Sequence, residues 1–296
     1  MVRGHINTDT TLSTPVSETD GGTAQSSYVS GDILYASSTD TLSKLPKGVD
    51  DEVLTLVTGL PSWEAAGGGG SSDASNLKIW DDFTEITGNG SNGQQVSTHF
   101  IINESGVSTN TSSGIGSNQH PGIIEIQNGT GTPPDGVKIK NPGEIRVGGG
   151  SIDVEFLFKI ETLSTSSVRY FLDIGLFGVG FDAEPTDGVY FYYSDNVNSG
   201  QWVGKSRNAS TETTANSTVA ANTNWTKLRV SINAAGTSAS YFIDDVEMSN
   251  SPITTNLPPN SIDLFMTFGA VKVISTTERN FEIDYASMDI ALTTER

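Results

Sequence analysis

The 296-residue sequence contains no cysteine, so disulfide bonds, thiolate nucleophiles and cysteine-based zinc sites are excluded. Charged residues are scarce at 17%, and hydrophobic residues make up only 35%, less than an ordinary globular chain contains. Any robustness outside a cell must therefore come from packing or from association between chains.

Long apolar runs are also missing. No segment approaches the ~18 consecutive apolar residues that cross a bilayer, so membrane insertion is not expected. The first five residues, MVRGH, do not begin the apolar run of a secretory signal. We expect a protein that is made in the cytoplasm and leaves the producing cell by lysis if it works outside it.

Basic residues are few: 16 Lys and Arg stand against 35 Asp and Glu, which gives a net charge of −19. A surface this acidic repels phosphate backbones, so a nucleic acid partner is not expected. The same charge keeps a protein that is displayed in many copies soluble.

What the sequence does contain is Gly, at 32 residues, together with many Ser, Thr and Asn. This mixture disfavours helices and is typical of short strands joined by turns. Residues 1–66 carry few large apolar side chains, residues 67–76 predict a flexible Gly/Ser linker, and residues 77–296 show repeated strand patterns.

The clearest strand pattern covers residues 152–160, where five apolar residues alternate with Asp153, Glu155 and other outward positions. Such alternation indicates a sheet with one face in a core. Residues 189–193 are apolar or aromatic on both faces, which predicts a strand covered on both sides. Further alternating segments lie at residues 124–126, 137–139, 145–147, 168–174, 228–232 and 262–268. Together they predict an all-β fold, an antiparallel β-sandwich.

The N-terminal part carries short motifs at fixed spacing: GGTAQSSY at residues 21–28, GDILYAS at 31–37, TLSKL at 41–45 and PSW at 61–63. This series resembles a module of bacteriophage tail-fibre and head-fibre proteins, with Ala24 where that module usually has Gly. The resemblance implies a slender, intertwined trimeric stalk that attaches a distal domain to the phage particle.

The apolar residues of this module are too few to close a core within one chain. Three chains wound together would bury them against one another, in agreement with the implied homotrimer. A disordered linker is the alternative, but such linkers are poor in large apolar and aromatic residues. The predicted stalk contacts are Ile33, Leu34, Tyr35, Leu42, Leu45, Leu54 and Trp63.

Residues 225–230, 241–245 and 281–285 more loosely resemble the concanavalin-A-like sandwich of lectins and glucanases. This resemblance implies a jelly roll, and a fold by itself assigns no activity. Retaining glucanases of this kind use a Glu-x-Asp-x-x-Glu strand. Glu282 and Asp284 match its first two positions, but Ser287 replaces the last carboxylate, so the protein is not expected to be an enzyme.

Asp153 and Glu155 are expected to lie on the solvated face of their strand. Asp244 and Asp245 predict a hairpin turn, and no loop supplies the ~6–8 oxygen ligands of a calcium site. The three histidines lack metal-ligand spacing. They are His5, His99 and His120. No metal and no cofactor is predicted.

Aromatic rings that stack on sugars are the remaining candidates for a site, because lectins combine aromatic faces with Asn and Asp. Trp202 is preferred, since it stands between two glycines in a loop-like stretch, and a core position is the alternative for each candidate. The candidate ligand contacts are Trp202, Tyr190, Tyr192 and Trp225.

These features predict a trimeric fibre or decoration protein on the virion surface of a phage, made in the host cytoplasm. Residues 1–30 would dock on a capsid or tail structural protein, residues 31–66 would form the stalk, and residues 77–296 the projecting head. Weak adhesion of the head to host-surface glycans is expected from the fold resemblance. The alternatives are a virion-associated polysaccharide depolymerase and a secreted carbohydrate-binding module, the latter disfavoured by the absent leader.

Overall fold

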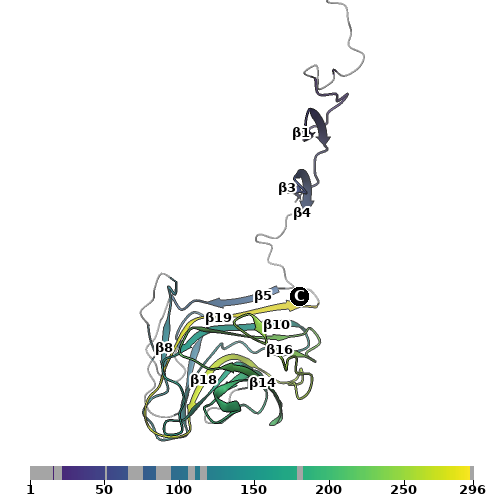
Figure 1. The fold of residues 1–296 in the computed structure, drawn as a ribbon. Coiled ribbons are helices and arrows are strands. Elements are labelled where there is room, and N and C mark those ends of the chain that lie inside the picture. The colour runs from purple at the N-terminus through teal and green to yellow at the C-terminus, as the bar shows by residue number, and fades with distance from the viewer. Residues whose placement is uncertain are drawn as a thin grey trace, which may run out of the picture. The chain divides into compact units, whose positions relative to one another are not determined.

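A computed structural model describes residues 16, 22–50, 52–65, 76–84, 95–105, 111–113, 119–178 and 183–293. The chain divides into two compact units, Met1–Asp73 and Ala74–Arg296 (Figure 1). The predicted docking segment, residues 1–30, lies outside the described residues except for residues 16 and 22–30, and His5 lies outside them. The predicted Gly/Ser linker also lies outside them apart from its last residue, Asn76.

The N-terminal unit contains two antiparallel hairpins. Strands β1 (Ile33–Ser38) and β2 (Thr41–Leu45) form the first, and β3 (Glu52–Val57) and β4 (Leu60–Ala65) the second. Thr58 and Gly59, both with positive φ, make the turn of the second hairpin. The indole Nε1 of Trp63 donates a hydrogen bond to the Pro46 carbonyl oxygen at 2.8 Å and so ties the second hairpin to the end of the first.

The apolar side chains of this unit stay open in the single chain. Leu54 lies opposite Trp63 and Leu56 opposite Pro61, so one face of the second hairpin is apolar. Leu56 is nevertheless 73% exposed and Leu54 49%. The other predicted stalk residues are half-buried: Ile33, Leu34, Tyr35, Leu42, Leu45 and Trp63. A two-stranded hairpin of this kind is at best marginally stable alone, and the trimeric stalk stays a prediction.

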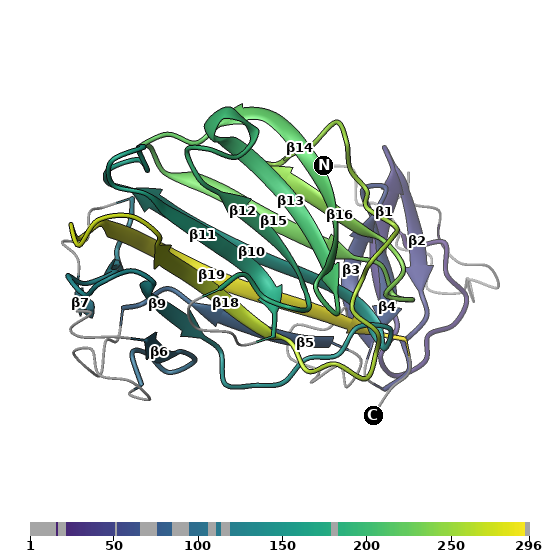
Figure 2. The same ribbon diagram turned by 90° about the horizontal axis from the view of Figure 1, so that it is seen from below.

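The C-terminal unit contains two antiparallel sheets packed face to face (Figures 1 and 2). In the eight-stranded sheet the order is β17-β16-β15-β10-β19-β8-β7, with β5 also beside β19; in the seven-stranded sheet it is β14-β13-β12-β11-β18-β9-β6. The strands of the first sheet are β5 (Asn76–Asp81), β7 (Thr111–Ser113), β8 (Ile124–Gln127), β10 (Gly150–Ile160), β15 (Thr226–Ile232), β16 (Ala239–Ile243), β17 (Val246–Glu247) and β19 (Asn280–Leu292). Those of the second are β6 (Ile101–Ser105), β9 (Asp135–Lys140), β11 (Tyr170–Phe177), β12 (Gly188–Tyr193), β13 (Gln201–Asn208), β14 (Thr211–Ala220) and β18 (Phe265–Lys272).

The predicted all-β sandwich is confirmed. Over the described ranges the one helical element is the 3-10 turn Asn198–Gly200. These ranges contain no helix that could span a membrane. Strand β10 alternates between buried and half-buried residues along its whole length, as its sequence predicts. Strand β12 is buried on both faces, also as predicted.

Three predicted segments differ from the structure. The strand predicted from residue 168 begins only at Tyr170, the first residue of β11. Residues 145–147 form no strand, since Ile145 makes only an isolated bridge to Leu264. Just before this segment, the Asn141 side chain accepts a hydrogen bond from the Gly143 amide at 2.9 Å, in the turn that follows β9. The strand predicted from residue 262 begins only at Phe265, although Leu264 is buried.

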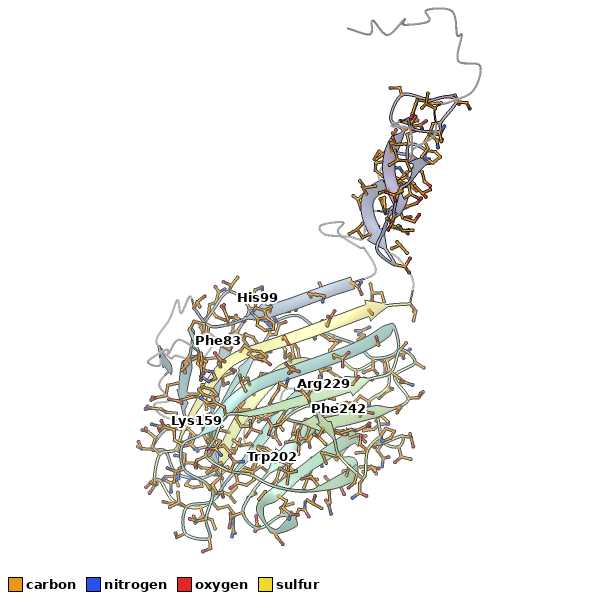
Figure 3. The ribbon with its side chains drawn as sticks, turned by 45° about the horizontal axis from the view of Figure 1, so that its top comes forward. Phe83, His99, Lys159, Trp202, Arg229 and Phe242 are labelled. Atoms are coloured by element: carbon orange, nitrogen blue, oxygen red, sulfur yellow. The ribbon has the colours of Figure 1, made fainter. Side chains whose placement is uncertain are left out.

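The core between the sheets is aromatic at its centre, and Trp202 belongs to it. Its ring packs edge to face against the rings of Phe158 and Phe191, with ring centroids 5.7 Å and 6.4 Å apart. Only 1% of the residue is exposed. The prediction of Trp202 as an exposed sugar contact is therefore wrong. Trp202 is the second residue of β13, which begins at Gln201, so it belongs to a strand and not to a loop. Its side chain points between the two sheets (Figure 3).

A second apolar cluster covers the outer face of the seven-stranded sheet. Its buried members are Phe171, Phe177, Tyr190, Tyr192, Val203 and Val271. Charged side chains are buried on this same face, among them Lys138, Asp173 and Lys205. This sheet is therefore covered on both sides around its centre.

The position of Trp202 predicts a large loss of stability on truncation. Trp202→Ala should lower the free energy of unfolding by about 3–5 kcal/mol, because it removes buried surface and leaves a cavity. Trp80→Ala, at a residue that is 57% exposed, should cost about 1 kcal/mol through its lost ring stacking. Urea unfolding followed by near-UV circular dichroism measures both, and equal losses would contradict this assignment of core and surface.

Candidate functional site

A row of side chains crosses the outer face of the eight-stranded sheet. Trp80 lies opposite Ser287, Ser287 opposite Glu155, Glu155 opposite Arg229, and Arg229 opposite Phe242. Directly opposed residues share one face of a sheet, so these five residues form a continuous line, which we call the aromatic row. Five strands at a spacing of ~4.8 Å make the row about 19 Å long.

Trp80 ends the row on strand β5. Leu77 and Ile79 pack against the core, so the alternation of the strand turns Lys78 and Trp80 outward. The indole stacks on the ring of Tyr285, with 4.7 Å between ring centroids and an interplanar angle of 16°. Trp80 is still 57% exposed, which is unusual for so large an apolar surface.

Tyr285 links the stacked rings to the polar middle of the row. Its hydroxyl donates a hydrogen bond to Glu155 Oε1. Burial, followed by this bond to Glu155, raises the pKa of Tyr285 well above its ordinary value. The phenol therefore remains a donor at every physiological pH and fixes the position of the Glu155 carboxylate within the row.

Arg229 and Phe242 form the other end. The guanidinium carbon lies 3.8 Å from the centre of the Phe242 ring, and the two residues come from the neighbouring strands β15 and β16 (Figure 3). Arg229 Nη1 also donates to Asp153 Oδ1 at 3.2 Å, and its Nε lies 3.9 Å from Glu155 Oε2. The guanidinium is thus fixed in place by a ring and two carboxylates.

Beside the aromatic row lies a shallow cavity of about 250 Å³ on the same face. Its walls include Lys78 and Asp289, whose Nζ and Oδ2 atoms are 2.7 Å apart. Its lining residues are Asn76, Lys78, Ser151, Asp153, Asp289 and Ala291. Row and cavity together offer exposed rings next to hydroxyl, amide, carboxylate and cationic groups. Such a surface suits an extended ligand that combines apolar faces with hydroxyl groups.

The structure places the predicted contacts Tyr190 and Tyr192 on the other sheet. Both project from β12 to the outer face of the seven-stranded sheet, but they are 0% and 6% exposed. The Tyr192 ring stacks on Phe171 and carries the Lys205 ammonium 4.0 Å from its centre. Neither ring offers an open face, so their prediction as stacking contacts is wrong.

Trp225, the fourth predicted contact, lies just before β15 and is half-buried. Its ring stacks on His120 with centroids 4.3 Å apart, and the Lys159 ammonium lies 6.0 Å from its centre. Trp225 is therefore separate from the aromatic row, and its role as a sugar contact stays a prediction.

The two carboxylates of the glucanase-like motif on β19 have different basic partners. Glu282 Oε2 binds Lys159 Nζ at 2.7 Å, while Asp284 Oδ2 lies 2.8 Å from His120 Nδ1. An irregularity in the β10–β19 register falls next to Asp284. The third motif position, Ser287, is part of the aromatic row.

Other predictions on polar residues can be checked directly. Asp244 and Asp245 make the turn between β16 and β17 with φ values of 48° and 67°, which confirms the predicted hairpin turn. Asp153 and Glu155 lie on the outer face of β10, as predicted. His99 lies 3.5 Å from Asp81, a carboxylate that also accepts the amides of Phe83 and His99.

Sequence reasoning missed Trp80 and Phe242. A signal was present for both, since Leu77 and Ile79 flank the outward positions of β5, and Tyr241 and Ile243 flank Phe242. It also missed a cavity of about 410 Å³ formed by three loops that are distant in sequence. The cavity is lined by Val147, Gly148, Ala235, Gly236, Thr237, Thr254, Asn256, Leu257, Pro258, Pro259 and Asn260.

Comparison with known proteins found similar solved structures. The protein SO2946 of unknown function from Shewanella oneidensis MR-1 is similar, with a TM-score of 0.56 and 14% identity over 76% of this chain and 91% of that one. The potassium-bound carbohydrate recognition domain of Emp46p has a TM-score of 0.48 at 10% identity, over 73% of this chain and 97% of that one. The cellulose-induced protein Cip1 has a TM-score of 0.47 at 11% identity, over 71% and 96%. At these identities the likeness concerns the fold alone, and the curated proteins contain no match.

The family comparison is more direct. Residues 119–284 match the family described as SO2946-like, C-terminal domain. This stretch covers strands β8 to β18 and the first part of β19, which is more than half of the chain. The chain therefore belongs to the SO2946-like C-terminal domain family.

Proposed function

We propose that this protein is a fibre or decoration protein of a phage virion, and that its sandwich unit binds host-surface polysaccharide through the aromatic row. The observation that carries the binding role is the exposed Trp80, stacked on Tyr285 at the end of a line of hydrogen-bonding groups. The attachment role rests on the motif series in residues 21–63.

The chemistry of the aromatic row fits a polysaccharide. A pyranose ring presents C–H groups on its faces, which pack on an indole, and hydroxyl groups at its edge. Glu155 accepts hydrogen bonds, Arg229 donates them, and Ser287 does both. A surface about 19 Å long spans several consecutive sugar units of an extended chain.

Binding without cleavage is part of the proposal. In the enzyme alternative two carboxylates flank the scissile bond. Glu282 and Asp284 are instead each engaged by a separate basic side chain. Ser287 supplies no third carboxylate.

The stalk is supported by the open apolar face of the second hairpin. Most of the large hydrophobic side chains that are exposed in the described residues belong to the N-terminal unit, with Leu56 at 73% among them. Exposed apolar surface of this kind marks an association site. Three copies of the chain would cover it.

The first prediction concerns the aromatic row. On an array of bacterial surface polysaccharides, Trp80→Ala should weaken binding at least about tenfold, since an aromatic residue that dominates binding typically contributes more than ~1.4 kcal/mol. Val219→Ala, at an exposed residue of β14 on the other sheet, serves as the control and should leave binding unchanged. Binding that survives Trp80→Ala but is lost with Trp225→Ala would transfer the site to Trp225.

The second prediction concerns assembly. The full chain should have the mass of a trimer in sedimentation equilibrium, and Leu56→Asp should dissociate it because a buried unpaired charge is costly. Val246→Asp is a matched control, since Val246 is 70% exposed and lies in the sandwich unit. A monomer in the unsubstituted protein contradicts the stalk.

The third prediction concerns cleavage. Polysaccharides that bind on the array should release no new reducing ends after long incubation with the protein. Release that is abolished by Glu282→Gln would instead establish the depolymerase alternative.

A further inference from the structure

Charged side chains that are largely buried form a network on the outer face of the seven-stranded sheet. Lys205 and Arg207 project from β13, and Glu184 reaches them from the segment before β12. Glu184 Oε2 lies 2.7 Å from Lys205 Nζ and 3.3 Å from Arg207 Nη1. The Lys205 and Arg207 side chains are only 6% and 14% exposed, while that of Glu184 is 28% exposed. Glu184 thus binds both cations, and its side chain is more exposed than either of theirs.

The floor beneath these cations is aromatic. The Lys205 ammonium lies 4.0 Å from the centre of the Tyr192 ring, and Tyr190 lies opposite Lys205 on the neighbouring strand. Burial, followed by the charge of Glu184, raises the pKa of Tyr192, so its hydroxyl stays protonated. The cations are therefore held in place by rings and by the sheet.

Asp173 is buried on the same face, and its protonation state sets the net charge of this network. The residue is 0% exposed, neither of its carboxylate oxygens accepts a hydrogen bond from the described residues, and Lys138 Nζ lies 3.9 Å away. Burial raises the pKa of Asp173 to about 7. With Asp173 neutral, the carboxylates of Glu184 and Glu212 are the charged partners that the described residues place within 4 Å of Lys205 and Arg207.

Glu184 can leave its place without unfolding the sheet. The chain is fixed from Thr186 onward, since the Thr186 carbonyl accepts the Ser210 amide at 2.8 Å and Asp187 accepts the Ala209 amide at 2.8 Å. Glu184 precedes these bonds and reaches the cations through its own side chain. Rotation about its side-chain bonds moves the carboxylate into solvent while β12 stays paired.

We propose that Glu184 occupies a carboxylate site formed by Lys205 and Arg207, and that a uronic acid unit of a polysaccharide binds there by displacing it. The ligand carboxylate would take the position of the Glu184 oxygens and receive charge-assisted hydrogen bonds from both cations. This inference rests on the proposed function, because it names an acidic sugar class for the same sandwich unit at a second site on the other sheet. The net charge of −19 provides no long-range attraction for such a ligand, so its selection depends on contact.

The experiment uses the full chain, with D-glucuronate as probe and D-glucose as its neutral counterpart, in NMR titrations near pH 7. Glu184→Gln keeps the shape of the side chain but removes the competing charge. If the occupied state prevails about ten to one, this change should lower the Kd for glucuronate about tenfold. The Kd for glucose should not move.

A matched control separates displacement from general electrostatics. Glu212 Oε2 also lies near Lys205 Nζ, at 3.3 Å, and its side chain is 41% exposed. Glu212→Gln removes the same unit of charge, yet should tighten glucuronate binding less than about threefold, since an exposed partner competes weakly. Equal gains from the two variants would overturn the proposal.

Two further variants complete the test. Adding Lys205→Met to Glu184→Gln should abolish the gain, whereas a lower Tm of Glu184→Gln with unchanged glucuronate affinity would show that the network only stabilises the fold. Trp80→Ala should leave the glucuronate gain intact, because Trp80 belongs to the other sheet. If Glu184→Gln gives no gain in glucuronate affinity while Trp80→Ala still weakens polysaccharide binding, only this inference is overturned. If Trp80→Ala leaves polysaccharide binding unchanged while Glu184→Gln still gives the gain, only the aromatic-row function is overturned.

Discussion

The pairing of β10 with β19 is the constraint on which the rest of the sandwich depends. It joins residues 150–160 to residues 281–292 near the C-terminus and places β15 on one side and β5 and β8 on the other. Its register turns Phe156 and Phe158 into the core, while Glu155 and Ser287 face outward as opposed neighbours. A slip of one residue would reverse both faces. The aromatic row exists because this register is maintained across five strands.

The outer faces of the two sheets differ in how far their aromatic and charged side chains are exposed. The eight-stranded sheet leaves aromatic and charged side chains accessible, with Trp80 as its largest exposed ring. The seven-stranded sheet buries its outer aromatic rings, and with them ion pairs whose desolvation is offset only when partners lie close. Glu184 is such a partner for Lys205. The eight-stranded sheet thus presents an accessible binding surface. On the seven-stranded sheet the proposed carboxylate site is occupied by Glu184 of the same chain.

The N-terminal unit follows another rule. Its hairpins place Leu54 and Leu56 on an apolar face that the described residues of the same unit leave largely exposed. A two-stranded hairpin cannot close a core, and the motif series through residue 63 implies several chains side by side. Under the proposed function this unit is stabilised by association between chains, whereas the sandwich has a core of its own.

The sequence by itself determined the fold class, because period-two alternation with turn residues between strands allows few other architectures, and β10 and β12 follow it residue by residue. It could not separate Trp202 from Trp80, since alternation shows that two neighbours face opposite ways but not which way leads to the second sheet. Only the tertiary structure decided that Trp202 fills the core while Trp80 meets solvent. The same holds for Glu184 with Lys205 and for Glu155 with Arg229. These contacts join residues from different strands or loops, and they form only when packing and register bring the side chains together.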